Sequence, residues 1–118
     1  MELTLSKIPL IASDPAEWNH FPGFLEEVIT QFNKDLSLAG APYEMHANSA
    51  EELMENMTSL CGLLSESNGE HLASLLYRID LKPEDLPFHD QQMEGEDLAR
   101  VMLKREAMKV LFRKYYSS

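Results

Sequence analysis

The sequence has few of the residues that build disulfides, small metal clusters and phosphate-binding loops. Its 118 residues include one cysteine, Cys61, and only five glycines. One cysteine excludes an intramolecular disulfide and a cysteine-rich zinc site. The glycines form no dinucleotide fingerprint, no phosphate-cradling loop and no Gly-x-Ser-x-Gly nucleophile elbow. We therefore expect a protein that is not an enzyme and that has neither a cofactor nor a metal centre.

Long apolar runs are also lacking. A membrane-spanning helix needs about 20 mostly apolar residues, and no segment approaches that length. The first residues combine Glu2, Lys7 and Pro9, which do not fit the basic start and unbroken apolar run of a secretory signal. The single cysteine suits a reducing compartment. These features predict a soluble, cytoplasmic protein with no membrane partner.

Basic residues are scarce and unevenly placed. Ten Lys and Arg face twenty Asp and Glu, which gives a formal net charge of −10. Residues 100–118 hold six of the ten basic residues and one acidic residue, Glu106. A strongly negative chain argues against general binding to nucleic acid or anionic membrane. The asymmetry instead describes an acidic body joined to one basic terminal segment.

The length and composition are those of one globular domain. A chain of 118 residues with 44% apolar and 25% charged residues can bury one core without disulfides. Apolar residues recur at helical spacing in four stretches, preceded by a short first turn near residues 15–20. The predicted helices cover residues 22–38, 49–66, 69–81 and 91–116.

Capping residues support these boundaries. Asp14 and Ser49 are each followed three residues later by Glu, which is a capping-box pattern. Pro22-Gly23 interrupts the first helical region, and Gly40-Ala41-Pro42 ends the second. The sequence predicts an all-α fold, a compact four-helix bundle-like single domain with residues 14–118 as its helical core. A strand over residues 75–81 is the alternative for the third helix.

The segment 1–13 is apolar but contains Pro9. We predict that it forms an extended N-terminal arm lying across the core. A short edge strand and a frayed terminus are alternatives that the sequence leaves open.

The last predicted helix carries a basic stripe, defined by Arg105, Lys109 and Arg113. These residues recur every four positions and therefore share a face. The helix is apolar on two other sides, with Val101, Met108, Phe112 and Tyr115 on one and Leu103, Ala107 and Val110 on the other. A helix with two apolar sides packs against neighbours on both, so we expect it to be central.

The basic stripe is the candidate partner-binding site. We predict a non-enzymatic protein-interaction or regulatory module that binds an acidic protein partner through this stripe, and that reversing its three charges weakens binding without unfolding the chain. Alternatively, the stripe is neutralised by acidic helices of the same chain, for which Glu51, Glu52 and Glu55 are candidates. Contact with a nucleic-acid backbone is a third, less favoured interpretation.

Two other classes of function are retained as alternatives. Glu17 and His20 have the Glu-x-x-His spacing of helical metal sites, although a second copy is lacking. A small-molecule or metal-binding helical bundle would have a closed pocket among the helices, lined by at least two of Glu17, His20, Glu70 and His71. A homodimeric structural subunit would instead bury the extra apolar face of the last helix between two copies.

Sulfur-containing residues are interpreted as core. Cys61 falls on the apolar stripe of its helix, where a thiol is usually structural. The seven methionines are adaptable packing groups, although a groove that exposed Met54 or Met57 would favour ligand binding.

Overall fold

The longest helix, α5, is the element around which the others are arranged. The computed structural model describes residues 3–67, 69–81 and 95–117. Helix α5 contacts each of the other four α-helices, as its two-sided apolar pattern predicts. The described residues contain only helices and connecting segments, so the all-α prediction is confirmed. The elements are η1 (Leu5–Lys7), α1 (Ile8–Ser13), η2 (Pro15–His20), α2 (Phe24–Leu38), α3 (Ala50–Ser67), α4 (Gly69–Ile79) and α5 (Gly95–Ser117).

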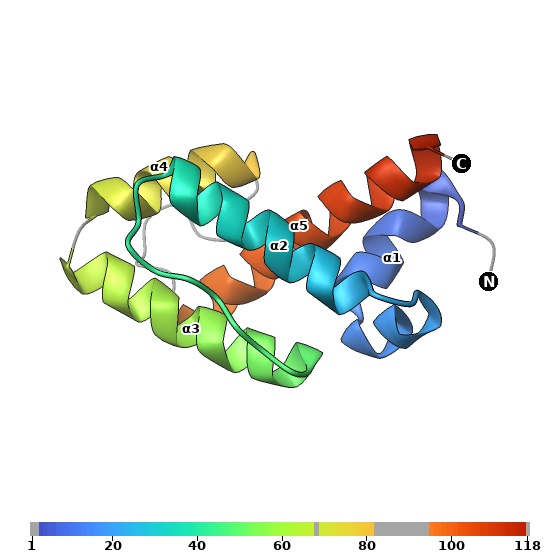
Figure 1. Ribbon diagram of the computed structural model, residues 1–118, viewed down its shortest axis with the longest axis horizontal. Coiled ribbons are helices and arrows are strands. Elements are labelled where there is room, and N and C mark those ends of the chain that lie inside the picture. The colour runs from blue at the N-terminus through green and yellow to red at the C-terminus, as the bar shows by residue number, and fades with distance from the viewer. Residues whose placement is uncertain (1–2, 68, 82–94, 118) are drawn as a thin grey trace.

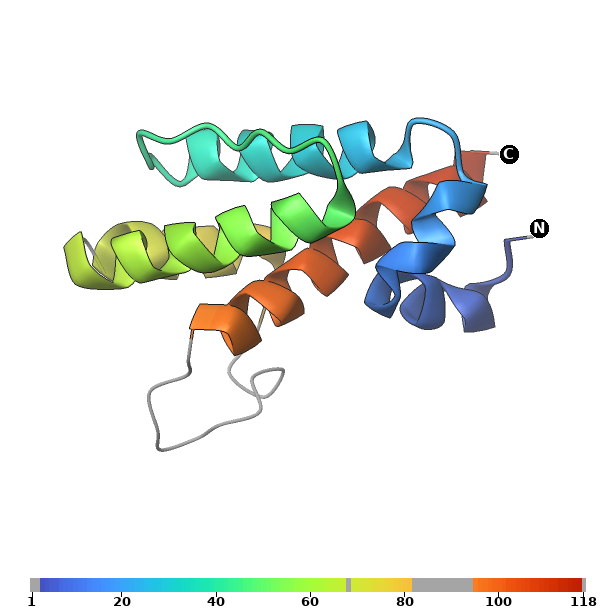
Figure 2. The ribbon, with the colours of Figure 1, turned by 90° about the horizontal axis from the view of Figure 1, so that it is seen from below.

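Helices α2 and α3 run in one direction across the molecule, and α4 and α5 run in the opposite direction (Figures 1 and 2). Helices α2 and α3 point the same way, because the connection between them returns along α2 before α3 begins. Helix α4 reverses the direction of α3, and the two form a helical hairpin. Helix α5 runs opposite to α2 and α3, and it ends beside α1 at the end of the molecule that also holds the N-terminus.

The helix caps predicted at Asp14 and Ser49 are present in the structure. The backbone N–H of Ala16 donates to the side chain of Asp14 over 3.1 Å, and the N–H of Glu52 donates to Oγ of Ser49 over 3.1 Å. Gly23, at the break between η2 and α2, has φ +76°, a left-handed conformation that glycine adopts without a Cβ clash. The two helix starts predicted from these caps are therefore confirmed.

The prediction that the N-terminal segment is an extended arm is wrong, and so is the edge-strand alternative. Residues 5–13 form η1 and α1, and α1 packs against α5. Ile8, Ile11 and Ala12 are buried at helical spacing, and Pro9 occupies the first turn, where its missing N–H costs no hydrogen bond. The indole N–H of Trp18 donates to the carbonyl of Ile11 over 2.9 Å and ties this helix to η2. Pro9 is therefore compatible with a helix here, because it lies at the start of α1 and not in its interior.

The strand alternative for residues 75–81 is also wrong, because α4 extends to Ile79. Leu75 and Ile79, four residues apart, are fully buried on one face. The helix ends at Asp80, whose φ of +70° is left-handed, and the N–H of Leu81 closes the end by donating to the carbonyl of Leu76. The predicted start of the last helix at residues 91–94 lies outside the described residues.

The connection between α2 and α3 is held by side-chain amides. Asn33 donates to the carbonyl of Met45 over 3.0 Å and accepts from its N–H, and Asn56 donates to the carbonyl of His46 over 2.7 Å. These hydrogen bonds pair backbone N–H and C=O groups that lie outside the helices and therefore have no partner within a helix. Within the described part of the chain, no helix has the length and apolar content that crossing a bilayer requires.

Candidate functional site

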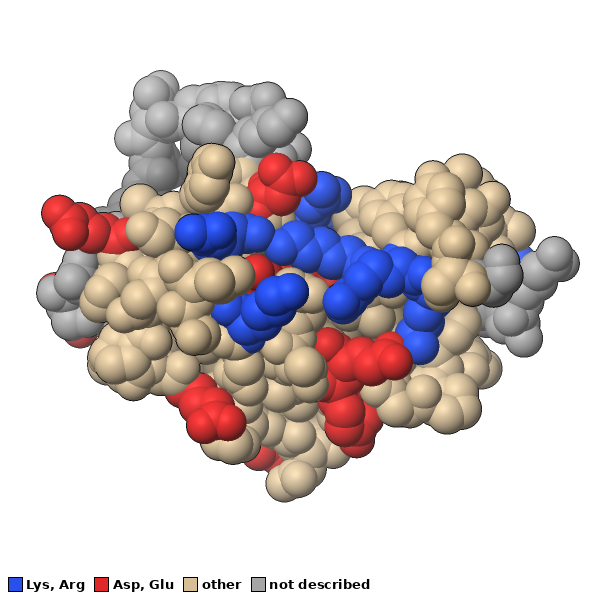
Figure 3. Space-filling view, turned by 45° about the horizontal axis from the view of Figure 1, so that its top comes forward, with Lys and Arg blue, Asp and Glu red and all other residues tan. Residues whose placement is uncertain are grey.

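Lys and Arg side chains gather in a row on one face of the molecule, with acidic side chains along its margins (Figure 3). Helix α5 supplies the three residues of the basic stripe and also Arg100, Lys104 and Lys114. The three residues of the basic stripe have different surroundings in the structure. Two of them have carboxylate partners within the chain, and one extends into solvent.

Arg105 pairs with the C-terminal end of α4. Its guanidinium donates to Oδ2 of Asp80 over 3.0 Å. The Arg105 side chain is 31% exposed and the Asp80 side chain is 63% exposed, so water screens the pair. The Nε–H of Arg105 is buried and has no hydrogen-bond partner in the part of the chain that the structure describes. The pair fixes where α5 passes the end of α4, but its contribution to stability is small.

Lys109 lies deeper and joins three helices. Its Nζ is 3.2 Å from Oδ2 of Asp35 on α2, and it donates to the carbonyl of Arg78 on α4 over 2.7 Å. Asp35 is only 3% exposed, and it also accepts from the side chain of Gln31 over 3.3 Å. A buried carboxylate needs such a partner, since an unpaired charge in the core is strongly destabilising. Lys109 is therefore a structural cation with little capacity for an external ligand.

A second carboxyl group, that of Glu106, lies beneath Lys109. Glu106 is completely buried, and its Oε1 is 3.6 Å from Nζ of Lys109. Among the described residues, neither of its oxygens has a partner at hydrogen-bond distance. Asp35, Glu106 and Lys109 together form what we term the buried charge cluster.

The surroundings of Glu106 favour its protonated form. Burial raises its pKa to about 9, the negative charge of the neighbouring Asp35 raises it further, and the positive charge of Lys109 opposes the shift. At neutral pH Glu106 is therefore mostly protonated and neutral, beside the ion pair of Lys109 and Asp35. This arrangement balances one charge against one and leaves no excess negative charge in the core.

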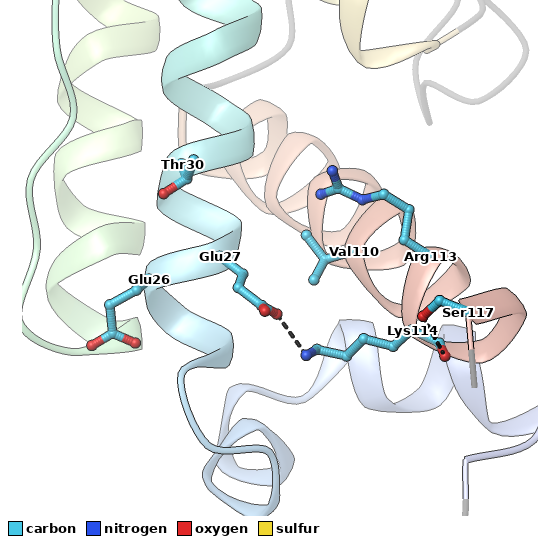
Figure 4. A pocket seen from close by; sticks show the side chains of 7 residues that line it. All are labelled: Glu26, Glu27, Thr30, Val110, Arg113, Lys114 and Ser117. Carbon is cyan, nitrogen blue, oxygen red and sulfur yellow. Dashed lines mark hydrogen bonds and ion pairs between the residues drawn. The ribbon is translucent and has the colours of Figure 1, made fainter.

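Arg113 differs from the other two stripe residues. It is exposed and has no ion pair with any described residue. With Glu26, Glu27, Thr30, Val110, Lys114 and Ser117 it lines a hollow of about 620 Å³, the α2/α5 groove (Figure 4). Lys114 is 2.7 Å from Glu27 across this groove, and Arg113 extends separately from that pair. Arg113 is the member of the stripe that remains available.

The acidic residues expected to neutralise the stripe are not the ones that do so. Arg105 pairs with Asp80 and Lys109 pairs with Asp35, whereas Glu51 and Glu55 lie exposed on α3 and line a different groove. Reversing all three stripe charges would add a third carboxylate to the buried cluster. The triple reversal is therefore unsuited to testing binding alone, and Arg113 can be tested singly.

Asp35 and Glu106 were not singled out from the sequence, although the pattern contained a signal. Asp35 follows Val28 and Phe32 at core spacing, and Glu106 falls between Leu103 and Val110 on a predicted apolar face. A carboxyl group at a position that periodicity assigns to the core indicates a buried ionisable group.

The structure supports neither a metal site nor a reactive thiol at the other candidate residues that it describes. Glu17 and His20 approach to 3.6 Å on η2, but the described residues contain no group of three or more side chains that could hold a metal ion. Cys61 is 1% exposed, and burial raises the pKa of its thiol to about 12. Its Sγ contacts Sδ of Met102 at 3.5 Å in the core, so the core interpretation is confirmed. A thiol with so high a pKa is a poor nucleophile at neutral pH.

Comparison of the chain with known protein families, with curated proteins and with solved structures gives no match.

Proposed function

We propose that the protein is a non-enzymatic interaction module of the cytoplasm that binds an acidic segment of a partner protein at the C-terminal part of α5, where Arg113 is exposed. The observation that carries the proposal is Arg113, an exposed guanidinium without a carboxylate partner in the described part of the chain, at a groove between two helices. A guanidinium binds carboxylates through two parallel hydrogen bonds, which makes it an effective anchor for acidic side chains.

The charges around Arg113 define how such a partner would lie. Glu27 is already paired with Lys114, so it contributes little repulsion. Glu26 lines the opposite wall of the α2/α5 groove and would repel an acidic ligand there. The acidic segment would therefore follow α5 rather than fill the groove.

The test is the binding of a Glu-rich peptide, labelled for fluorescence anisotropy, to three forms of the protein. Arg113→Glu should weaken binding by about tenfold, since it replaces a direct ion pair with a repulsion. Arg100→Glu is the matched control, because Arg100 is an exposed arginine on the first turns of α5 that pairs with Glu96 at 2.9 Å. Binding should also weaken as salt is raised.

Equal affinities for wild type and Arg113→Glu would refute the proposed site. Equal losses in Arg113→Glu and Arg100→Glu would show that the peptide responds to net charge rather than to a defined surface. Circular dichroism and urea unfolding establish that both variants are folded before the affinities are compared.

A homodimer is the second candidate, and one observation favours it. Leu38 is 52% exposed and Tyr77 is 79% exposed, and both line a shallow hollow of about 300 Å³ between α2 and α4. Large exposed apolar side chains that lie together often mark an interface. The molecular mass in solution tests this directly: a dimer that Tyr77→Asp converts to monomer would support it, and a monomeric wild type would exclude it.

A further inference from the structure

A second groove lies between α3 and α5, close to the end of α1. Its volume is about 640 Å³, and we term it the α3/α5 groove. Apolar side chains of three regions of the chain form its floor. They are Ala12 and Pro15 near the N-terminus, Ala50 and Met54 of α3, and Val101 and Leu103 of α5.

The two walls of this groove carry opposite charges. Glu51 and Glu55 are exposed on α3, and Arg100 and Lys104 are exposed on α5. Each pair is spaced by four residues, so each wall presents its charge over one helical turn, about 6 Å. Glu51, Glu55 and Lys104 have no ion pair with a described residue, and Arg100 pairs only with Glu96 of its own helix. The opposed charges line the groove without bridging it.

The distribution of polar groups favours a macromolecular ligand. Small-molecule sites usually aim a few buried polar groups at the ligand from within the pocket. Here the charged groups lie at the rim and the floor is apolar, which is the layout of a protein–protein interface. Met54 is half-buried on the floor, where its flexible thioether can adapt to an apolar side chain.

The shape of the groove favours a convex occupant. A helix laid between two helices inserts its apolar side chains and leaves its edges against the two walls. Two copies of this groove facing one another would satisfy the charges but would enclose an empty space. We propose that the α3/α5 groove binds an amphipathic helix of a partner protein, whose apolar stripe is flanked by Lys or Arg toward Glu51 and Glu55 and by Asp or Glu toward Arg100 and Lys104.

This inference does not depend on the acidic-partner proposal, because it uses a different groove and different residues. The probes are three synthetic helical peptides of about 18 residues with the same leucine stripe, each long enough to form about five turns. One has a basic and an acidic edge, one has two basic edges, and one has two acidic edges. Affinities are measured by anisotropy at physiological salt, where charges beyond about 8 Å are screened.

The wild-type protein should bind the mixed peptide most tightly, by about tenfold over the basic one. This ranking is informative because a net charge of −10 would by itself place the basic peptide first. The double variant Glu51→Lys/Glu55→Lys should prefer the acidic peptide, and Arg100→Glu/Lys104→Glu should prefer the basic peptide. Arg113→Glu, the control outside this groove, should leave the affinity for the mixed peptide unchanged.

Three results would overturn the inference. The basic peptide could bind best to wild type and to every variant, which would indicate attraction by net charge alone. A second such result is that no peptide binds any form of the protein although circular dichroism shows that every form is folded. The wild type could be a dimer that both double variants convert to monomer, which would make a second copy of the chain the occupant. The four substituted side chains are exposed, so loss of folding is not expected to obscure the comparison.

Discussion

Lys109 and Arg113 lie one helical turn apart on α5 and carry the same charge, but their surroundings differ. Lys109 is held by Asp35 and by the carbonyl of Arg78, above the buried Glu106. Arg113 has no carboxylate partner among the described residues and extends at the edge of the α2/α5 groove. The difference arises from the neighbouring helices, because α2 and α4 offer oxygen atoms to Lys109. A periodic charge pattern identifies a helix face, but the helices packed on that face decide what each charge does.

The pH-dependent effect expected within the buried charge cluster concerns Glu106. Its pKa of about 9 lies well above the ordinary value of 4.5, so the folded protein retains a proton that the unfolded chain releases between these values. Stability should therefore fall as pH rises from about 5 to 9, by at most about 1.4 kcal/mol per pH unit from this group. Glu106→Gln needs no proton, and at pH 8 it should be more stable than wild type by about 1–3 kcal/mol.

Urea unfolding of wild type and Glu106→Gln at several pH values from 5 to 9 measures this effect. The two curves should diverge as pH rises, since the wild type alone loses the protonation-dependent part of its stability. If the free energies of unfolding of the two proteins changed in parallel with pH, Glu106 would not be protonated in the folded protein at neutral pH. The cluster would then be more open to water than the structure shows.

A smaller effect is expected at Arg105, which is intermediate between Lys109 and Arg113. Its pair with Asp80 is partly exposed, and such pairs contribute up to about 1 kcal/mol. Arg105→Gln should therefore lower the free energy of unfolding by less than about 1 kcal/mol. Urea unfolding at pH 7 checks this value. A loss comparable to that of a buried pair, about 3 kcal/mol or more, would place Arg105 in the same class as Lys109.

Much of the fold could be predicted from the sequence because its signals are local. The capping residues Asp14 and Ser49, the break at Pro22-Gly23 and the apolar periodicity fix where helices begin and which faces they bury. The exception was residues 5–13, where a short helix depends on burial of Ile8 and Ile11 against α5. Helices this short are not stable alone, so tertiary packing decides their conformation.

The candidate sites were less predictable, because they depend on which helices meet. The sequence identified the basic stripe but could not distinguish Lys109 from Arg113, since Asp35 is 74 residues away along the chain. It also gave no indication that Glu51 and Glu55 face Arg100 and Lys104 across an apolar floor. Both arrangements follow from the packing of α2 and α3 on α5, which a single sequence does not specify.

The division of α5 into a structural cation and an available one is tested most directly by urea unfolding of Lys109→Gln and Arg113→Gln, measured together at pH 7. Lys109→Gln should lose about 3 kcal/mol, because it leaves the buried Asp35 carboxylate without its cation. Arg113→Gln should remain within about 0.5 kcal/mol of wild type. Two small losses of equal size would contradict the account, since they would mean that Lys109 is as free as Arg113.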